Sequence, residues 1–260
     1  AYEYDINTGR GSAAEAFGYG VGTYGAGFYG TTRSTSITLA PRTWDIQTWG
    51  QVLLSLHRRG NLYEWNPSTG GRATLVGNAP TNNTAMFVTD ERIVVILGAD
   101  GELMDVAWCD QNDYTDWTAA ADNQAGGFSL IGGSQLLCGA RLGNKVNLIW
   151  SDTECFAMQY QASEPYYSFR RRGDNNGILG PNAFAILDSR GYWMGDNRLL
   201  MYDGVPGDIP NMLDVRDYVY DDINLTQRDK IYAGVNPTHQ EIWWFYPSAA
   251  SDEIDRYVAY

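Results

Sequence analysis

Residues 183–202 read AFAILDSRGYWMGDNRLLMY, three short apolar runs separated by two tight turns. The first turn is Asp188-Ser189-Arg190-Gly191 and the second is Gly195-Asp196-Asn197; both are rich in residue types that favour reverse turns. Short apolar and aromatic runs between such turns are typical of antiparallel strands. This stretch therefore predicts two consecutive β-hairpins that share their middle strand.

Four other segments repeat this pattern. Their average spacing is roughly 45 residues, and the hairpins begin near Gln51, Ala85, Gln135, Ala183 and Lys230. Tryptophan recurs at strand ends, namely at Trp65, Trp108, Trp150, Trp193 and Trp243. A period of about 40 to 50 residues with several strands in each repeat is typical of propeller blades. We therefore predict an all-β fold over residues 41–260, a β-propeller-like repeat of about five four-stranded blades, in preference to a β-sandwich.

The composition agrees with a β fold. Hydrophobic residues make up 44% of the 260 residues, which is enough for a sizeable core. Nine Trp and eighteen Tyr favour strands, because broad rings pack well on a pleated surface. The 29 glycines suit a fold with many turns.

Residues 209–220 depart from the β pattern. Met212, Val215 and Val219 are spaced as on one face of a helix, which predicts a short helix here. Asp221 and Asp222 follow in the predicted exit loop. We interpret them as a solvated turn, because nothing makes two adjacent carboxylates converge on a substrate as acid and base must.

Residues 1–40 are predicted to form a Gly/Tyr-rich N-terminal arm. Glycines alternate with aromatic residues between Ser12 and Thr32, which is too much glycine for a self-supporting core. Two interpretations stay open: a flexible linker, or an extended arm that docks onto a neighbouring subunit through Tyr19, Tyr24, Phe28 and Tyr29. Ser12 and Glu15 stand at capping-box positions, which predicts one helical turn at residues 12–16.

The net charge of −13 argues against binding nucleic acid through a general basic surface. An acidic face lining a channel would instead repel DNA and let it pass; a solvated acidic surface is the simpler interpretation. One basic run interrupts the acidic chain, at Arg170, Arg171 and Arg172. It is either a solvated loop or a docking point for the acidic face of an adjacent copy, because Arg pairs bidentately with carboxylates.

The cysteine pattern excludes a disulfide scaffold. Cys109, Cys138 and Cys155 are an odd number without a CxxC pair, so we expect buried thiols in a protein made in a reducing cytoplasm. No apolar run is long enough to cross a membrane, and no signal peptide is visible. The chain begins at Ala1 and ends within an apparent strand at Tyr260, so we expect a piece of a longer polypeptide.

No residue pattern predicts catalysis, a metal or a cofactor. Asp110, Asp113 and Asp116 lack the alternate spacing and distal Glu of a calcium loop, so we expect them to bond backbone N–H groups in a connecting loop. His57 and His239 fall in predicted hairpin turns without triad partners. The glycine-rich arm lacks the Gly-Lys-Ser/Thr ending of a phosphate loop.

An ordered set of segments resembles bacteriophage tail and packaged-DNA-stabilising proteins, the nozzle or tail tubular proteins of short-tailed phages. It spans Tyr19 to Tyr260 and comprises RTWDIQTWGQVLL (42–54), RGNLYEW (59–65), AP (79–80), ER (91–92), WT (117–118), NQAG (123–126), WMG (193–195), YVYDDIN (218–224) and EIWWFYPS (241–248).

The resemblance implies a structural virion protein without catalytic residues or cofactors. It implies a propeller-containing subunit in a ring of identical copies, expected to be a hexamer, below the portal and adaptor of the tail. DNA would be retained and ejected through this ring without sequence-specific binding, after assembly in the host cytoplasm. The chain stops soon after Arg256-Tyr257-Val258, which leaves closure of the propeller within it open. The alternative is a carbohydrate-binding or carbohydrate-degrading propeller acting on the host surface. The many aromatic residues support this alternative, because their rings could stack on sugars.

Overall fold

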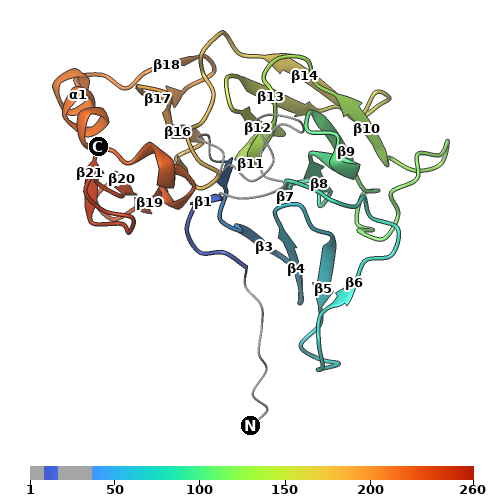
Figure 1. Cartoon of the computed structure of the whole chain (residues 1–260). Helices are drawn as coiled ribbons and strands as arrows, with labels where there is room; N and C mark the ends of the chain where they lie inside the picture. The colour runs from blue at the N-terminus through green and yellow to red at the C-terminus, as the bar shows by residue number, and fades with distance from the viewer. Residues whose placement is uncertain (1–8, 17–36) are drawn as a thin grey trace, which may run out of the picture.

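The chain folds as a five-bladed β-propeller in a computed structural model that describes residues 9–16 and 37–260 (Figure 1). In this part of the chain, four blades have four antiparallel strands and the fifth has three. Blade 1 contains β3 (Trp44–Trp49), β4 (Val52–His57), β5 (Leu62–Trp65) and β6 (Thr74–Leu75). Blade 2 contains β7 (Ala85–Val88), β8 (Val94–Leu97), β9 (Asp105–Trp108) and β10 (Gly126–Ser129).

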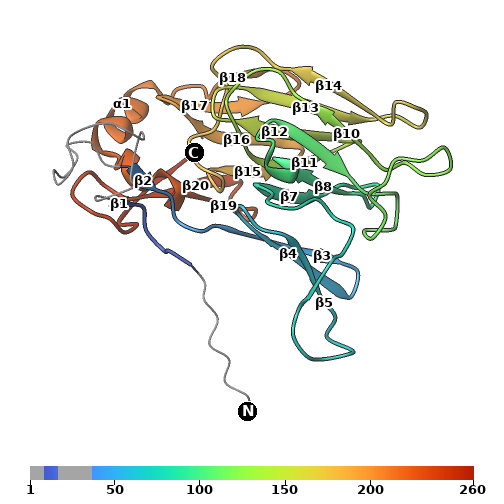
Figure 2. The same ribbon diagram turned by 45° about the vertical axis from the view of Figure 1, so that its right-hand side comes forward.

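The remaining blades follow in chain order. Blade 3 contains β11 (Leu136–Gly143), β12 (Val146–Ser151), β13 (Cys155–Tyr160) and β14 (Tyr167–Arg171). Blade 4 contains β15 (Phe184–Leu187), β16 (Arg190–Gly195), β17 (Arg198–Tyr202) and β18 (Pro206–Asp208). Blade 5 contains β19 (Tyr232–Asn236), β20 (Glu241–Tyr246) and β21 (Arg256–Ala259). The first strand of each blade lies near the middle of the molecule, and β14 and β18 lie toward the rim (Figure 2).

Local turn chemistry sets the hairpins. Asn144 and Lys145 join β11 to β12 and both have positive φ, of 54° and 64°, as in the two-residue turn whose twist matches paired strands. Asp188 and Ser189, between β15 and β16, also have positive φ. The predicted hairpin of residues 183–202 is confirmed, with Trp193 paired to Phe184 on one side and to Leu200 on the other.

Tryptophans in the second strands connect neighbouring blades. Trp150 on β12, Trp193 on β16 and Trp244 on β20 are fully buried. The rings of Trp150 and Trp193 meet edge-on with centroids 5.5 Å apart. The indole of Trp244 donates to the Ala183 carbonyl of blade 4 at 3.1 Å. Trp243 was the tryptophan predicted to recur here, but the strand alternation turns it to the opposite face of the sheet and buries Trp244 instead.

The positions of some predicted elements need correction. The first blade begins at Trp44 rather than near Gln51, because β3 precedes the predicted hairpin. The helical turn predicted at residues 12–16 is wrong: Ala14–Ala16 form strand β1, which pairs with β2 (Ile37–Leu39). The predicted short helix is present as α1 (Leu213–Asp222) and extends beyond Tyr220. Asp221 and Asp222 therefore lie in its last turn rather than in an exit loop.

The described N-terminal residues are attached to the far end of the chain. The side-chain amide of Gln227, in the 3-10 helix η2 (Leu225–Lys230), accepts from the Ala13 N–H at 2.9 Å and donates to the Ala13 carbonyl at 3.1 Å. Arg58, which directly follows β4, forms an ion pair with Asp229 at 3.5 Å. These contacts link residues next to blade 1 with the segment that enters blade 5.

Gly177 tests how tightly blades 3 and 4 pack. A Cβ at this position would stand 2.5 Å from the backbone carbonyl carbon of Asp152 and the nitrogen of Thr153. Because backbone cannot move aside cheaply, we predict that Gly177→Ala lowers the free energy of unfolding by about 1–3 kcal/mol in urea titrations. Gly207→Ala is the matched control, since a Cβ there meets nothing within 4 Å. Equal stability of the two variants would show that the blades adjust freely.

Candidate functional site: a central cavity

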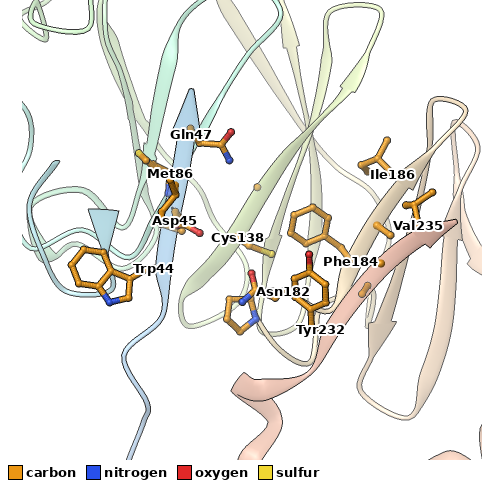
Figure 3. A pocket seen from close by; sticks show the side chains of 17 residues that line it. Trp44, Asp45, Gln47, Met86, Cys138, Asn182, Phe184, Ile186, Tyr232 and Val235 are labelled. Atoms are coloured by element: carbon orange, nitrogen blue, oxygen red, sulfur yellow. Dashed lines mark hydrogen bonds between the residues drawn. The ribbon is translucent and has the colours of Figure 1, made fainter. Parts of the chain in front are cut away.

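The inner strands of all five blades enclose a cavity of about 530 Å³ (Figure 3). This volume lies within the range of small-ligand sites, roughly 300–1,000 Å³. Its lining alternates polar, aromatic and aliphatic side chains. The side chains labelled in the close-up are Trp44, Asp45, Gln47, Met86, Cys138, Asn182, Phe184, Ile186, Tyr232 and Val235.

Asp45 supplies the charge of this cavity. On β3 its half-buried side chain alternates with the exposed Trp44 and Ile46, so it lies on the side of the strand that faces β7. Its Oδ2 accepts a hydrogen bond from the Met86 N–H at 3.0 Å. Within the described residues, no Lys, Arg or His side chain lines the cavity with it. Burial therefore raises the pKa of Asp45 from 3.8 to about 6, against the opposing effect of the Met86 hydrogen bond.

Three neutral polar side chains accompany Asp45. In the described part of the chain, the amides of Gln47 and Asn182 and the hydroxyl of Tyr232 make no hydrogen bond within the protein. They come from β3, the segment before β15, and β19. Figure 3 shows Asp45 and Phe184 pointing toward one another from opposite sides, with Asn182 and Tyr232 directed into the same space. The cavity can therefore offer hydrogen bonds in several directions around an aromatic wall.

The described lining holds one carboxylate, that of Asp45, and one thiol, that of Cys138. Among the described residues, Asp45 is the one carboxylate in the lining, whereas glycoside hydrolysis commonly uses two across the substrate. The Cys138 thiol lies nearby, but burial raises its pKa well above the usual value, with the charge of Asp45 acting in the same direction. A thiol in that state is a poor nucleophile.

The aspartates of the predicted connecting loop bond to their own loop, as predicted. Asp110 accepts from the Gln124 N–H at 2.7 Å, and Asp113 accepts from the Thr115 N–H at 2.9 Å. Asp116 accepts from the Thr118 N–H at 3.2 Å. In residues 9–16 and 37–260, no group of three or more His, Cys, Asp or Glu side chains is arranged to hold a metal ion. The three cysteines are buried and unpaired, as expected.

The predicted interface residues fall into two groups. Tyr19, Tyr24, Phe28 and Tyr29 lie outside the described residues. Of the arginine run, Arg171 forms a bidentate pair with the nearly buried Glu154, with Nε 2.8 Å from Oε2, and a second ion pair with Asp174. The guanidinium of Arg172 lies over the ring of Tyr202 at 6.0 Å. Arg170 is exposed, so it is the member of the run that stays available for a partner.

Blade 5 presents a second notable surface, which we call the aromatic face: Tyr232, Trp243, Phe245 and Tyr257. The strand register places these four residues on the same side of the sheet, opposite the buried Trp244 and Val258. Trp243 and Tyr257 stack with centroids 4.9 Å apart and an interplanar angle of 15°. Tyr257 is 61% exposed and Tyr232 is 55% exposed. No described strand pairs with the outer edge of β21.

A groove lies between the outer parts of blades 2 and 3. This groove of about 700 Å³ is lined by Trp108, Phe128, Tyr166 and Phe169, together with the alanines of residues 119–121. Phe128 and Phe169 are stacked with centroids 4.9 Å apart and rings 8° from parallel. Phe128 is half exposed, so a flat aromatic surface is open to solvent.

Sequence reasoning did not identify the central cavity. Asp45 belongs to the segment RTWDIQTW that carried the family resemblance, but the five lining strands are far apart in the chain. The usable signal was an Asp within the strand-like run 44–49, whose other residues are all uncharged. Which strands meet around it depends on the order of the blades.

Comparison of the sequence with protein-family models and with curated proteins gives no match. Solved structures resemble the fold. A protein from Lactobacillus plantarum is 12% identical with a TM-score of 0.43, and 85% of this chain and 72% of that one are covered. The extracellular domain of the putative one component system BT4673 from B. thetaiotaomicron is 11% identical with a TM-score of 0.48, covering 82% and 27%. Apo AztD from Citrobacter koseri is 11% identical with a TM-score of 0.41, covering 88% and 61%.

The raised pKa of Asp45 predicts a pH-dependent stability. Between about pH 4 and pH 6 the folded protein keeps a proton that the unfolded chain releases, so wild-type stability falls as the pH rises through this window. Asp45→Asn removes the charge and keeps an acceptor for Met86. We predict that the variant is about 1–3 kcal/mol more stable than wild type at pH 7.5 and similar at pH 4, measured by urea unfolding. A difference that does not change with pH would contradict burial of the charge.

Proposed function

We propose that this chain is a structural subunit of a phage tail that assembles with identical copies into a ring through which DNA is retained and ejected. The resemblance of its ordered segments to nozzle and tail tubular proteins supports this function. The ring would contact the portal or adaptor and other tail proteins. The subunit has no catalytic role in this proposal.

The aromatic face of blade 5 is the observation that carries the proposal. The second strands of blades 2, 3 and 4, β8, β12 and β16, are buried on both faces over most of their length. In blade 5, by contrast, β20 is fully buried only at every second residue, and Tyr232 and Tyr257 stay more than half exposed. Blade 1 likewise leaves Ile46 57% exposed. Clusters of exposed aromatic residues on a soluble protein mark surfaces that bind other proteins. A neighbouring subunit that covers the aromatic face would bury it as the inner blades are buried.

The charge of the chain fits the same role. With a net charge of −13, the subunit repels the phosphate backbone at long range. Repulsion lets DNA move past without sticking, which a conduit requires. The exposed Arg170 on the rim strand β14 could pair with an acidic face of an adjacent copy, while Arg171 already neutralises Glu154 within the chain.

The role of the aromatic face can be tested by Tyr257→Lys. The substitution places a charge on the surface that we expect to be buried between subunits. We predict that wild-type protein elutes as a closed oligomer and the variant mainly as a monomer, by size-exclusion chromatography with light scattering. Ile131→Lys is the control, because Ile131 is 90% exposed in the loop between blades 2 and 3.

Electron microscopy of the oligomer would then show whether it is a ring with a DNA-sized channel. The proposal fails if wild-type protein stays monomeric at all concentrations and is absent from purified virions by mass spectrometry. Equal loss of assembly in the Tyr257 and Ile131 variants would mean that the aromatic face has no special part in it.

The groove between blades 2 and 3 favours a second candidate function, carbohydrate binding on the host surface. The ring of Phe128 is stacked on that of Phe169 and is half exposed, and the apolar face of a sugar ring can stack on an exposed aromatic ring of this kind. The volume of the groove, about 700 Å³, lies within the range of small-ligand sites, roughly 300–1,000 Å³.

This second function predicts that Phe169→Ala abolishes binding in a screen against host polysaccharides. The substitution removes the ring on which Phe128 is stacked, and we expect at least a tenfold loss of affinity by glycan array followed by calorimetry. Tyr218→Ala is the control, since Tyr218 is an aromatic residue 68% exposed on α1, away from the groove. A screen without any hit for wild type would eliminate this candidate.

A further inference from the structure

The carboxylate of Asp45 is a buried charge without a cation. The described residues that line its cavity provide one N–H, from Met86, and otherwise neutral groups. Leaving an ionised carboxylate partly desolvated costs free energy unless a positive charge approaches it. The ionised Asp45 therefore lowers the stability of the folded protein, and it does so in the cavity that the first strands of all five blades line.

The aromatic wall adds a second requirement on the occupant. Phe184 points into the cavity opposite Asp45, and Tyr232 approaches from β19 (Figure 3). Faces of aromatic rings attract cations, most strongly where water is excluded. Anions are disfavoured by Asp45 and by the overall charge of −13.

The remaining polar groups set the size and polarity of the occupant. Gln47, Asn182 and the Tyr232 hydroxyl have hydrogen-bonding capacity that the protein does not use. A volume of about 530 Å³ accommodates a small organic molecule rather than a bare ion. The described residues also offer no cluster of ligands for a metal.

We propose that the central cavity binds a small organic cation, an ammonium or quaternary ammonium compound, with its charge held between the Asp45 carboxylate and the ring of Phe184 and its polar end bonded by Asn182, Gln47 and Tyr232. The raised pKa of Asp45 is consistent with this proposal, because a cation bound beside the carboxylate would lower that pKa and favour the ionised form. The cavity shares only Tyr232 with the aromatic face, and Asp45 and Phe184 lie outside that face, so the Asp45 and Phe184 variants test binding apart from assembly.

Calorimetric titration with choline tests the proposal. We expect saturable binding to the wild-type protein at pH 7.5 and at least tenfold weaker binding to Asp45→Asn. The neutral isostere 3,3-dimethylbutan-1-ol separates charge from shape. It should bind wild type at least tenfold more weakly than choline does, and bind both proteins with similar affinity.

Two further variants keep the result interpretable. Phe184→Leu retains the charge and much of the volume but loses the ring, and we expect about tenfold weaker choline binding. Asp122→Asn makes the same change of net charge at an exposed loop position and should leave choline binding unchanged. Circular dichroism and melting curves verify that each variant is folded.

Several outcomes would overturn the proposal. One is that the wild-type protein shows no saturable binding of choline and, in a second titration with a primary ammonium compound, none of butylammonium. Equal affinity of wild type and Asp45→Asn for choline would show that the carboxylate does not hold the cation. Tight binding of glucose, with no binding of choline, would identify a neutral polyol site instead. A monomeric wild-type protein that still binds choline would contradict the ring and leave the cavity proposal standing.

Discussion

Contact between neighbouring blades through buried tryptophans is the constraint on which the rest of this structure depends. A four-stranded sheet with apolar residues on both faces cannot bury them alone, so each blade needs a neighbour. Trp150, Trp193 and Trp244 occupy equivalent second strands and are fully removed from water. Each indole buries about 150–250 Å² of surface, so these three residues contribute strongly to the core that joins blades 3, 4 and 5.

Radial packing of this kind also creates the central cavity. The blades diverge outward, and their first strands meet around a space that their side chains do not fill. Strand alternation decides which side of a strand each residue occupies, so Asp45 and Gln47 lie on the side of β3 that faces β7, while Trp44 and Ile46 lie on its opposite side. The polar character of the cavity therefore follows from the register of a few strands rather than from any local motif.

The same constraint explains the exposed surfaces at the two ends of the blade series. Blades 1 and 5 each have one face without a neighbouring blade from the described residues. The aromatic face of blade 5 has the composition of an interior surface, with Trp243 stacked on Tyr257, yet it borders solvent. The two proposals therefore concern different parts of the molecule. Assembly involves the outer surface and the exposed faces of the end blades, and ligand binding involves the central cavity.

The sequence by itself determined the class of fold and the approximate position of most strands. Turn residues such as Asp188 and Asn197, between apolar runs, act locally, because backbone preference depends on a residue and its close neighbours. The same local information placed the helix near Met212 and the backbone-bonded aspartates of the Asp110 loop. It failed at residues 12–16, where pairing of β1 with β2 outweighed the capping-box pattern.

Only the tertiary structure decided the site. Asp45, Cys138, Asn182 and Tyr232 come from four different parts of the chain, and their convergence depends on how successive blades turn around the centre. Tertiary packing also chose between Trp243 and Trp244, which are equivalent in composition but point to opposite faces. A one-residue change of strand register exchanges inside and outside, so the sequence pattern could locate this strand without showing which tryptophan the neighbouring blade would bury.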